Sequence, residues 1–228
     1  MSVDLEFSKY AHSYERYGII QDKVADELLS LLKYKPKKIL DLGCGRGALI
    51  KKIDWEVQHF LGVDFAKRML ELHPKGEGIE CIYGDFDNPE LYEQLFLYDF
   101  DYILSASALQ WSDNIEALFA RIERLNFQDF AFAIFTANTF KTLHSTAGIS
   151  SPLPSKEQIL QAAASHFHCK SYVQEYTLEF ENTLEMFRYI KRSGVSGNRN
   201  LLGYKEMKNL MRTYPLNHLE FEVLFLYS

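Results

Sequence analysis

Short apolar runs alternate with amphipathic stretches along most of this 228-residue chain. The apolar runs have the length of buried strands, which predicts strands at residues 38–42, 59–64, 80–83, 100–105 and 130–135. Apolar residues at helical spacing predict helices at residues 21–33, 66–72 and 115–125, and another from a glycine-rich loop through Lys52. Such alternation favours a parallel sheet with helices on both faces.

The last third of the chain departs from this alternation. Ser155, followed three residues later by Gln158, has the pattern of a capping box and predicts a helix at residues 155–164. Residues 170–180 and 221–227 are predicted strands, with predicted helices at residues 183–192 and 205–213 between them. Helices at that place, instead of a tight hairpin, indicate an insertion over the carboxyl edge of the sheet, where open α/β sheets bind ligands.

Together these elements predict an α/β fold. We expect a Rossmann-like, doubly wound, seven-stranded, mostly parallel sheet with helices on both faces and a helical insertion before the last strand. The length favours a single domain over residues 1–228. Within it we distinguish an N-terminal cap (1–35), a core (36–135) and a C-terminal part with substrate-covering helices (136–228).

Composition and charge narrow the class of protein. A net charge of −6 disfavours broad nucleic-acid binding. No stretch reaches the roughly 18 to 20 apolar residues that cross a bilayer, and the first residues lack a secretory signal, so we expect a cytoplasmic protein without a membrane partner. Cys44, Cys81 and Cys169 are scattered and form no C-x-x-C pair, which argues against a disulfide framework or a zinc site.

A glycine-rich loop, Asp41-Leu42-Gly43-Cys44-Gly45-Arg46-Gly47, follows the first predicted strand. Glycines allow a sharp turn and a close approach of ligand to backbone. Gly43, Gly45 and Ala48 also satisfy a dinucleotide-binding pattern. Asp41 separates the two interpretations, because an acid at the mouth of the loop would repel a pyrophosphate but attract the ammonium and sulfonium of S-adenosylmethionine (SAM). The loop therefore favours SAM as the cofactor.

Two more acids follow the next two predicted strands. Asp64 is placed to accept both ribose hydroxyls, and Asp85 to accept from the adenine amino group while Phe86 packs beside the ring. Each acid alone could merely cap the following helix. Three acids at successive strand ends, with glycines at the first, favour a cofactor site over capping.

Beyond the loop, three segments carry a closer resemblance: Phe7-x-x-x-Ala11-x-x-Tyr14 followed by Gln21, the run from Ser105 to Gln110 and Trp111, and residues 187–195. The chain resembles the malonyl-acyl-carrier-protein O-methyltransferases of biotin synthesis, within the class I SAM-dependent methyltransferases. The resemblance implies methyl transfer to the free carboxylate of a malonyl thioester on acyl-carrier protein, giving the ester that starts pimeloyl synthesis. Two residues depart from the family: Ala106 replaces a common Asn, and Arg46 a common Thr. We expect Arg46 to point into solvent.

The resemblance also implies roles for individual residues. Tyr14 takes the main active-site role, donating to the acceptor oxygen and closing the pocket. The residues implied in cofactor binding are Gln21, Asp41, Gly43, Cys44, Gly45, Asp64, Asp85, Phe86 and Ser105, while Gln110 and Trp111 are implied in the substrate pocket. The alternatives are that Tyr14 and Gln21 are surface residues and that Trp111 belongs to the core. A carboxylate is already ionised at neutral pH, so no general base and no metal is needed.

Residues 188–212 contain seven cations and one acid. An acidic carrier protein would dock on such a surface, which assigns carrier docking to Arg188, Lys191, Arg192, Arg199 and Lys205. The alternative is an ordinary solvated face. Two other functions stay open: a methyltransferase for a small-molecule acid or quinol-like acceptor, and a SAM-binding protein without transfer activity.

Overall fold

The computed structural model describes residues 18–193 and 204–228. It contains the predicted seven-stranded, mostly parallel sheet, with strand order β3-β2-β1-β4-β5-β7-β6. The strands are β1 Lys38–Leu42, β2 His59–Asp64, β3 Ile79–Tyr83, β4 Asp99–Ala106, β5 Asn126–Phe135, β6 Lys170–Glu179 and β7 His218–Tyr227. β1 to β5 are parallel to their neighbours, whereas β7 is antiparallel to both β5 and β6.

The helices follow the predicted order with two additions, α5 and α7. They are α3 Ile19–Ser30, α4 Lys67–Glu71, α5 Pro89–Leu95, α6 Ile115–Ile122, α7 Lys141–Ala147, α8 Lys156–His166, α9 Thr183–Ser193 and α10 Tyr204–Thr213, with a 3₁₀ turn at Leu109–Trp111. The capping box of Ser155 and Gln158 is present at the start of α8. α5 begins at Pro89, and the side chain of the N-cap residue Asn88 accepts from the Glu90 amide. Asn followed by Pro is a common start of a helix, so the sequence contained a signal for α5. None of the described helices combines the length and the apolar composition needed to cross a membrane.

The prediction of a helix from the glycine loop through Lys52 is wrong. Residues 45–52 form successive turns. The Gly47 amide donates to the Cys44 carbonyl three residues back, while the Lys51 amide donates to the Gly47 carbonyl four residues back. Gly47 has φ of +77°, which a right-handed helix does not accommodate, so this glycine interrupts helical propagation.

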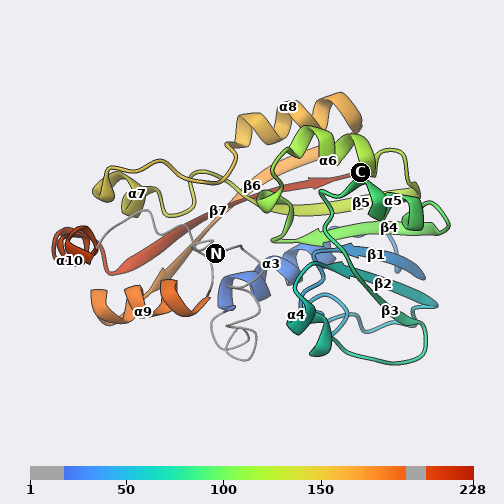
Figure 1. The fold of residues 1–228 in the computed structure, drawn as a ribbon, viewed down its shortest axis with the longest axis horizontal. Helices are drawn as coiled ribbons and strands as arrows, with labels where there is room; N and C mark the ends of the chain where they lie inside the picture. The colour runs from blue at the N-terminus through green and yellow to red at the C-terminus, as the bar shows by residue number, and fades with distance from the viewer. Residues whose placement is uncertain (1–17, 194–203) are drawn as a thin grey trace.

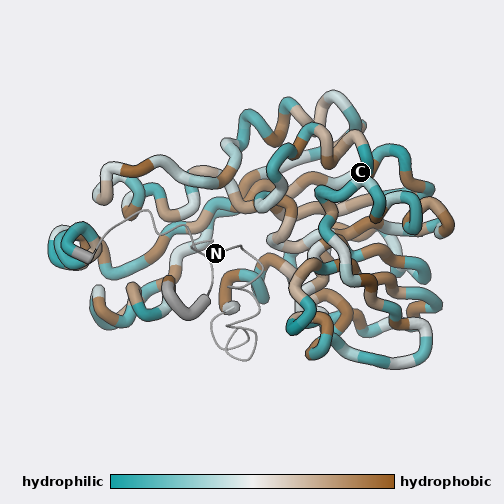
Figure 2. The backbone as a smooth tube through the Cα atoms, in the orientation of Figure 1, coloured by the Kyte–Doolittle hydropathy of each residue, from teal (hydrophilic) through white to brown (hydrophobic). Residues whose placement is uncertain are grey.

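Two apolar layers cover the sheet, and neighbouring strand residues point into opposite layers. Leu40 and Leu42 of β1 pack with the helices α5, α6 and α8 on one face. Ile39 packs with residues of α3, α7, α9 and α10 on the other face. Figure 2 shows the hydrophobic residues concentrated in the strands between these layers.

The topology creates a binding crevice at the carboxyl edge of the sheet. β1 pairs in parallel with β2 on one side and with β4 on the other, so the order in which successive strands are added reverses at β1. Ligands of open α/β sheets bind outside the carboxyl ends of the strands at such a switch point. α9 follows the carboxyl end of β6, which runs in the same direction as β5 because both are antiparallel to β7. The insertion therefore begins at the same edge as the crevice, as predicted, and Figure 1 shows α7, α9 and α10 grouped at that end.

The glycine loop packs closely on the segment after β4. Gly43 has φ of +79°, and a Cβ there would lie 2.1 Å from the Cβ of Ala108. Gly45 also has a positive φ, of +53°, but a Cβ there would meet nothing within 4 Å. The two glycines thus serve different needs: close packing at Gly43, and an open space above the loop at Gly45.

We expect Gly43→Ala to destabilise the protein more than Gly45→Ala does. Both substitutions place a side chain at positive φ, which costs about 1–2 kcal/mol. Only the methyl group at position 43 also overlaps Ala108, which adds about 1–3 kcal/mol of overpacking. Equilibrium urea unfolding without cofactor measures both losses, and equal losses would contradict the close packing on Ala108.

Candidate functional site

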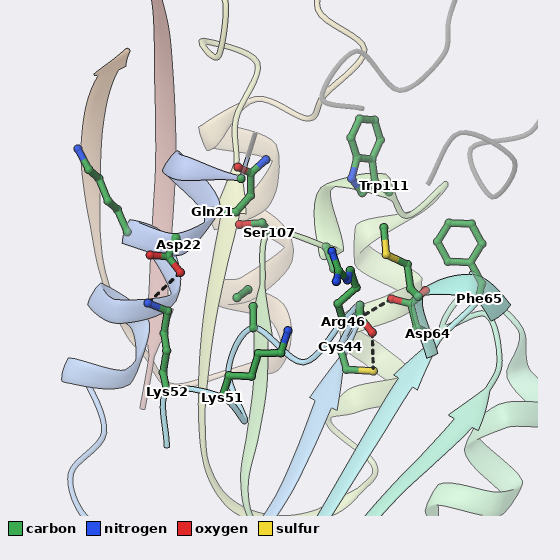
Figure 3. A pocket seen from close by; sticks show the side chains of 18 of the residues that line it. Gln21, Asp22, Cys44, Arg46, Lys51, Lys52, Asp64, Phe65, Ser107 and Trp111 are labelled. Carbon is green, nitrogen blue, oxygen red and sulfur yellow. Dashed lines mark hydrogen bonds and ion pairs between the residues drawn. The ribbon is translucent and has the colours of Figure 1, made fainter. Parts of the chain in front are cut away.

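A cavity of about 540 Å³ opens at the carboxyl edge of the sheet. This volume lies within the range of roughly 300–1,000 Å³ that small-molecule sites occupy. The start of α3, the glycine loop, the end of β2 and the segment after β4 form its wall, and Figure 3 shows their side chains around it. The cavity is therefore built where the sequence placed the cofactor, with Gln21, Gly43, Cys44, Gly45, Asp64, Phe86 and Trp111 all in the wall.

The end of β2 holds the glycine loop in place. The amides of Gly43 and Cys44 both donate to the Val63 carbonyl, at 2.8 and 3.0 Å. The carboxylate of Asp64 accepts from the Gly45 amide at 2.9 Å through Oδ2 and from the Ala66 amide at 2.8 Å through Oδ1. Each carboxylate oxygen has a second acceptor position, so Asp64 can hold the loop and still accept ribose hydroxyls.

Oε1 of Gln21 and Oγ of Ser107 are buried in the wall and have no hydrogen-bond partner among the described residues. Leaving a buried polar atom unpaired costs about 1–3 kcal/mol, so these atoms fit a polar ligand in the cavity. Ser107 also has φ of +64°, a conformation uncommon for a residue with a side chain and often found at binding sites. Figure 3 shows the side chains of Gln21 and Ser107, both of which line the cavity.

The side of the cavity near β2 is apolar. Phe86 is almost fully buried there, and Phe65 and Met69 belong to the same wall. The sequence analysis identified Phe86 but missed Phe65, Met69 and Ser107. The position of Phe65 immediately after Asp64 at a strand end was a usable signal, whereas that of Met69 within a short helix was not. An apolar surface beside Asp64 suits the adenine ring of SAM, while the Asp64 carboxylate can accept from the ribose hydroxyls.

Of the three acids predicted around the mouth, the structure places only Asp64 in the cavity wall. Asp41 is buried beneath the loop, 2% exposed and outside the wall. Burial raises the pKa of Asp41 to about 7, although His73 opposes that rise. Asp85 is exposed, and its Oδ1 accepts from the Asp87 amide at 2.9 Å, which is a turn contact within its own loop. The cofactor roles of Asp41 and Asp85 remain predictions.

Cations also line the cavity, which the sequence analysis did not foresee. The expectation that Arg46 points into solvent is wrong, because it is half-buried and belongs to the wall. Lys51 and Lys52 lie in the same wall, and the Lys52 ammonium is paired with Asp22 at 2.9 Å and Asp26 at 2.8 Å. The wall thus carries both signs of charge, which suits a ligand that has both carboxylate and cationic groups.

The segment after β4 contributes to the site indirectly as well as directly. Ser105 is fully buried and donates to the Leu42 carbonyl at 2.6 Å, so it joins β4 to β1 outside the cavity wall. Gln110 is also outside the wall, and its Nε2 donates to the carbonyl of Ser107 at 2.7 Å. Gln110 therefore supports the left-handed turn at Ser107, while Trp111 itself reaches the cavity.

Of the five predicted docking residues, the structure describes the side chains of two. Arg188 on α9 and Lys205 on α10 are exposed. The side chains of Lys191 and Arg192, together with Arg199 and the predicted catalytic Tyr14, lie outside the described residues. The basic surface hence stays a prediction that Arg188 and Lys205 support by their exposure.

Comparison with known proteins agrees with this geometry. Residues 39–126 match the family described as "Methyltransferase domain". In solved structures the fold is similar to that of the YcgJ protein of Bacillus subtilis, with a TM-score of 0.65 at 14% identity, covering 90% of this chain and 97% of that one. It is also similar to a Haemonchus contortus phosphoethanolamine N-methyltransferase solved with S-adenosylhomocysteine, with a TM-score of 0.52 at 16% identity, covering 89% and 52%.

Two curated relatives are similar over nearly the whole chain. The malonyl-[acyl-carrier protein] O-methyltransferase of Geobacter sulfurreducens is 30% identical over 240 aligned residues, covering 91% of this chain and 88% of the relative. The enzyme of the same name from Anoxybacillus flavithermus is 26% identical, covering 84% and 79%. Because this chain is 30% identical to the Geobacter enzyme over 88% of that relative's length, it belongs to the malonyl-[acyl-carrier protein] O-methyltransferase family of SAM-dependent methyltransferases.

Proposed function

We propose that this protein transfers the methyl group of SAM to the free carboxylate of a malonyl group carried on acyl-carrier protein, forming the methyl ester that starts pimeloyl synthesis for biotin. One observation carries the proposal. A single cavity joins the glycine loop and Asp64, which suit the cofactor, to Trp111 and Arg46, which suit an anionic acceptor. The names of the relatives from Geobacter and Anoxybacillus support the same acceptor.

The chemistry requires little from acid–base groups. A malonyl carboxylate is ionised at neutral pH, so no side chain has to remove a proton. SAM, when bound, supplies a methyl group made electrophilic by the sulfonium. The residues of the cavity then act by orientation: Asp64 and Gln21 hold the cofactor, and the positive charge of Arg46 favours entry of the anionic carboxylate.

Alignment and exclusion of water provide most of the acceleration. Holding two reactants in line can supply up to about 7–11 kcal/mol. Trp111 and Phe86 line the cavity with aromatic surface, which reduces the space for water near the reacting atoms. The attack neutralises a carboxylate and a sulfonium together. A water-poor cavity solvates these charged reactants poorly, so it favours the transition state, in which the charges are partly neutralised.

The acceptor is tested by incubating the protein with isotope-labelled SAM and malonyl-carrier protein, followed by mass measurement of the carrier. We expect the carrier to gain one labelled methyl group. Acetyl-carrier protein is the matched control, because it has the same thioester and carrier but no free carboxylate, and we expect it to gain none. If the protein binds SAM but does not methylate malonyl-carrier protein, the proposed acceptor is wrong. The protein would then be a methyltransferase for a small-molecule acceptor or a SAM-binding protein without transfer activity.

The cofactor role of Asp64 is tested by Asp64→Asn. Replacing the carboxylate weakens the acceptor for both the ribose hydroxyls and the Gly45 amide, and hydrogen bonds to charged groups contribute about 1.5–3 kcal/mol. We expect the Kd for SAM, measured by calorimetry, to rise at least about tenfold. Asp54→Asn, at an exposed carboxylate paired with Lys35, is the control and should leave the Kd unchanged. An unchanged Kd in Asp64→Asn would exclude Asp64 from cofactor binding.

Carrier docking is tested by reversing the two described cations of the basic surface, in the double variant Arg188→Glu with Lys205→Glu. Both side chains are exposed, so the change acts on association rather than on folding. We expect KM for malonyl-carrier protein to rise about tenfold at low salt while the Kd for SAM stays the same. Lys170→Glu, an exposed site at the opposite end of β6, is the control. Equal weakening of carrier and SAM would contradict a docking role.

A further inference from the structure

Three side chains that are distant in the sequence meet behind the glycine loop. Cys44 belongs to the loop, His73 follows α4, and Cys81 is in the middle of β3. Their sulfur and ring nitrogen atoms all lie within 4.8 Å of one another. Cys44 and His73 are each 4% exposed, whereas Cys81 is exposed at the surface. The proposed transfer reaction uses neither His73 nor Cys81.

The orientation of His73 is that of a metal ligand. Its Nδ1 lies 2.9 Å from the Pro74 carbonyl, and because a carbonyl only accepts, Nδ1 carries the proton. Nε2 then has a lone pair directed away from the backbone, and the side chain of Cys81, another member of the cluster, interacts with this ring. Histidines that bind metals commonly donate their other ring N–H to a backbone carbonyl in this way.

Two glycines leave the space in which the cluster forms. A Cβ at Gly62 of β2 would lie 2.7 Å from the sulfur of Cys44. A Cβ at Gly47 would lie 3.1 Å from Nε2 of His73. A side chain at position 62 would displace the Cys44 sulfur, and one at position 47 would crowd the His73 ring, so the two glycines permit the three donors to approach one another.

We propose that Cys44, His73 and Cys81 bind a thiophilic divalent cation of the zinc class, with the fourth position open to water. Two thiolates and one imidazole are a ligand set that Zn²⁺ uses. A tetrahedral ion with bonds of about 2.0–2.3 Å spaces its donors about 3.5–4 Å apart, so side-chain shifts of about 1 Å complete the site. Binding forms two metal–sulfur bonds and one metal–nitrogen bond, and releases the thiol protons to solvent without any change of oxidation state.

The surroundings favour a cation at this place. The buried carboxyl of Asp41 lies close enough to interact with both His73 and Cys81, and its Oδ1 has no hydrogen-bond partner in the described part of the chain. The exposure of Cys81 provides an entry path from solvent. Cys44 also lines the cofactor cavity, so a bound ion would link the glycine loop to β3 and stabilise the loop in its cofactor-binding shape.

The test is titration of the reduced, metal-free protein with Co²⁺ under anaerobic conditions, followed by displacement with Zn²⁺. We expect a thiolate-to-cobalt charge-transfer band that saturates at one equivalent, and a rise in Tm with Zn²⁺. Cys81→Ser removes an exposed ligand with little effect on folding, and should weaken cobalt binding more than about 100-fold. Cys169→Ser, at the third cysteine outside the cluster, is the matched control and should bind cobalt like the unmodified protein.

Two results would overturn the proposal. One is the absence of the charge-transfer band, or its persistence at full strength in Cys81→Ser. The other is a reduced protein that binds no metal but forms a Cys44–Cys81 disulfide on oxidation, identified by peptide mass, which would make the pair a redox couple instead. Both readouts are independent of the methyl-transfer reaction, so failure of this proposal leaves the proposed function untouched.

Discussion

The cofactor site depends on the hydrogen bonds that fix the glycine loop to the carboxyl end of β2. The Val63 carbonyl accepts from two successive loop amides, and Asp64 accepts from a third, at Gly45. These bonds hold the loop open beside the switch point at β1, and the same Asp64 faces the cavity. The loop, the end of β2 and the ligand surface thus form one unit, and displacement of any part would displace the others.

Local irregularity is concentrated around this unit. Ser107 adopts a left-handed conformation that Gln110 supports, and the unpaired oxygens of Ser107 and Gln21 lie in the cavity wall. Proteins retain such costly features mainly where a ligand or a reaction needs them. The wall carries both signs of charge for the same reason, which is that its ligands do. SAM carries a carboxylate and two cationic groups, and the proposed acceptor is an anion.

Elements with a strong local pattern were predictable. The strands β1 and β2 have the predicted bounds, because short apolar runs between polar turns leave few other solutions. The capping box at Ser155 is equally local, since both of its hydrogen bonds join residues three apart. α7 was missed because Phe140, at its N-cap in a left-handed conformation, carries none of the usual start signals.

The sequence by itself determined the doubly wound sheet, the glycine loop and the position of Asp64 at a strand end, because each depends on residue order and short-range periodicity. Tertiary structure decided where the remaining side chains face. Gly47 interrupts the expected helix through its φ of +77°, and only a glycine fits there because a Cβ would lie 2.5 Å from Pro74, which is 27 positions further along the chain. Arg46 enters the cavity, and Cys44, His73 and Cys81 meet, only because β1, β2 and β3 pair in parallel. Such long-range proximity leaves no local pattern, so two cysteines that look scattered in the sequence form, with His73, a cluster of donors in the fold.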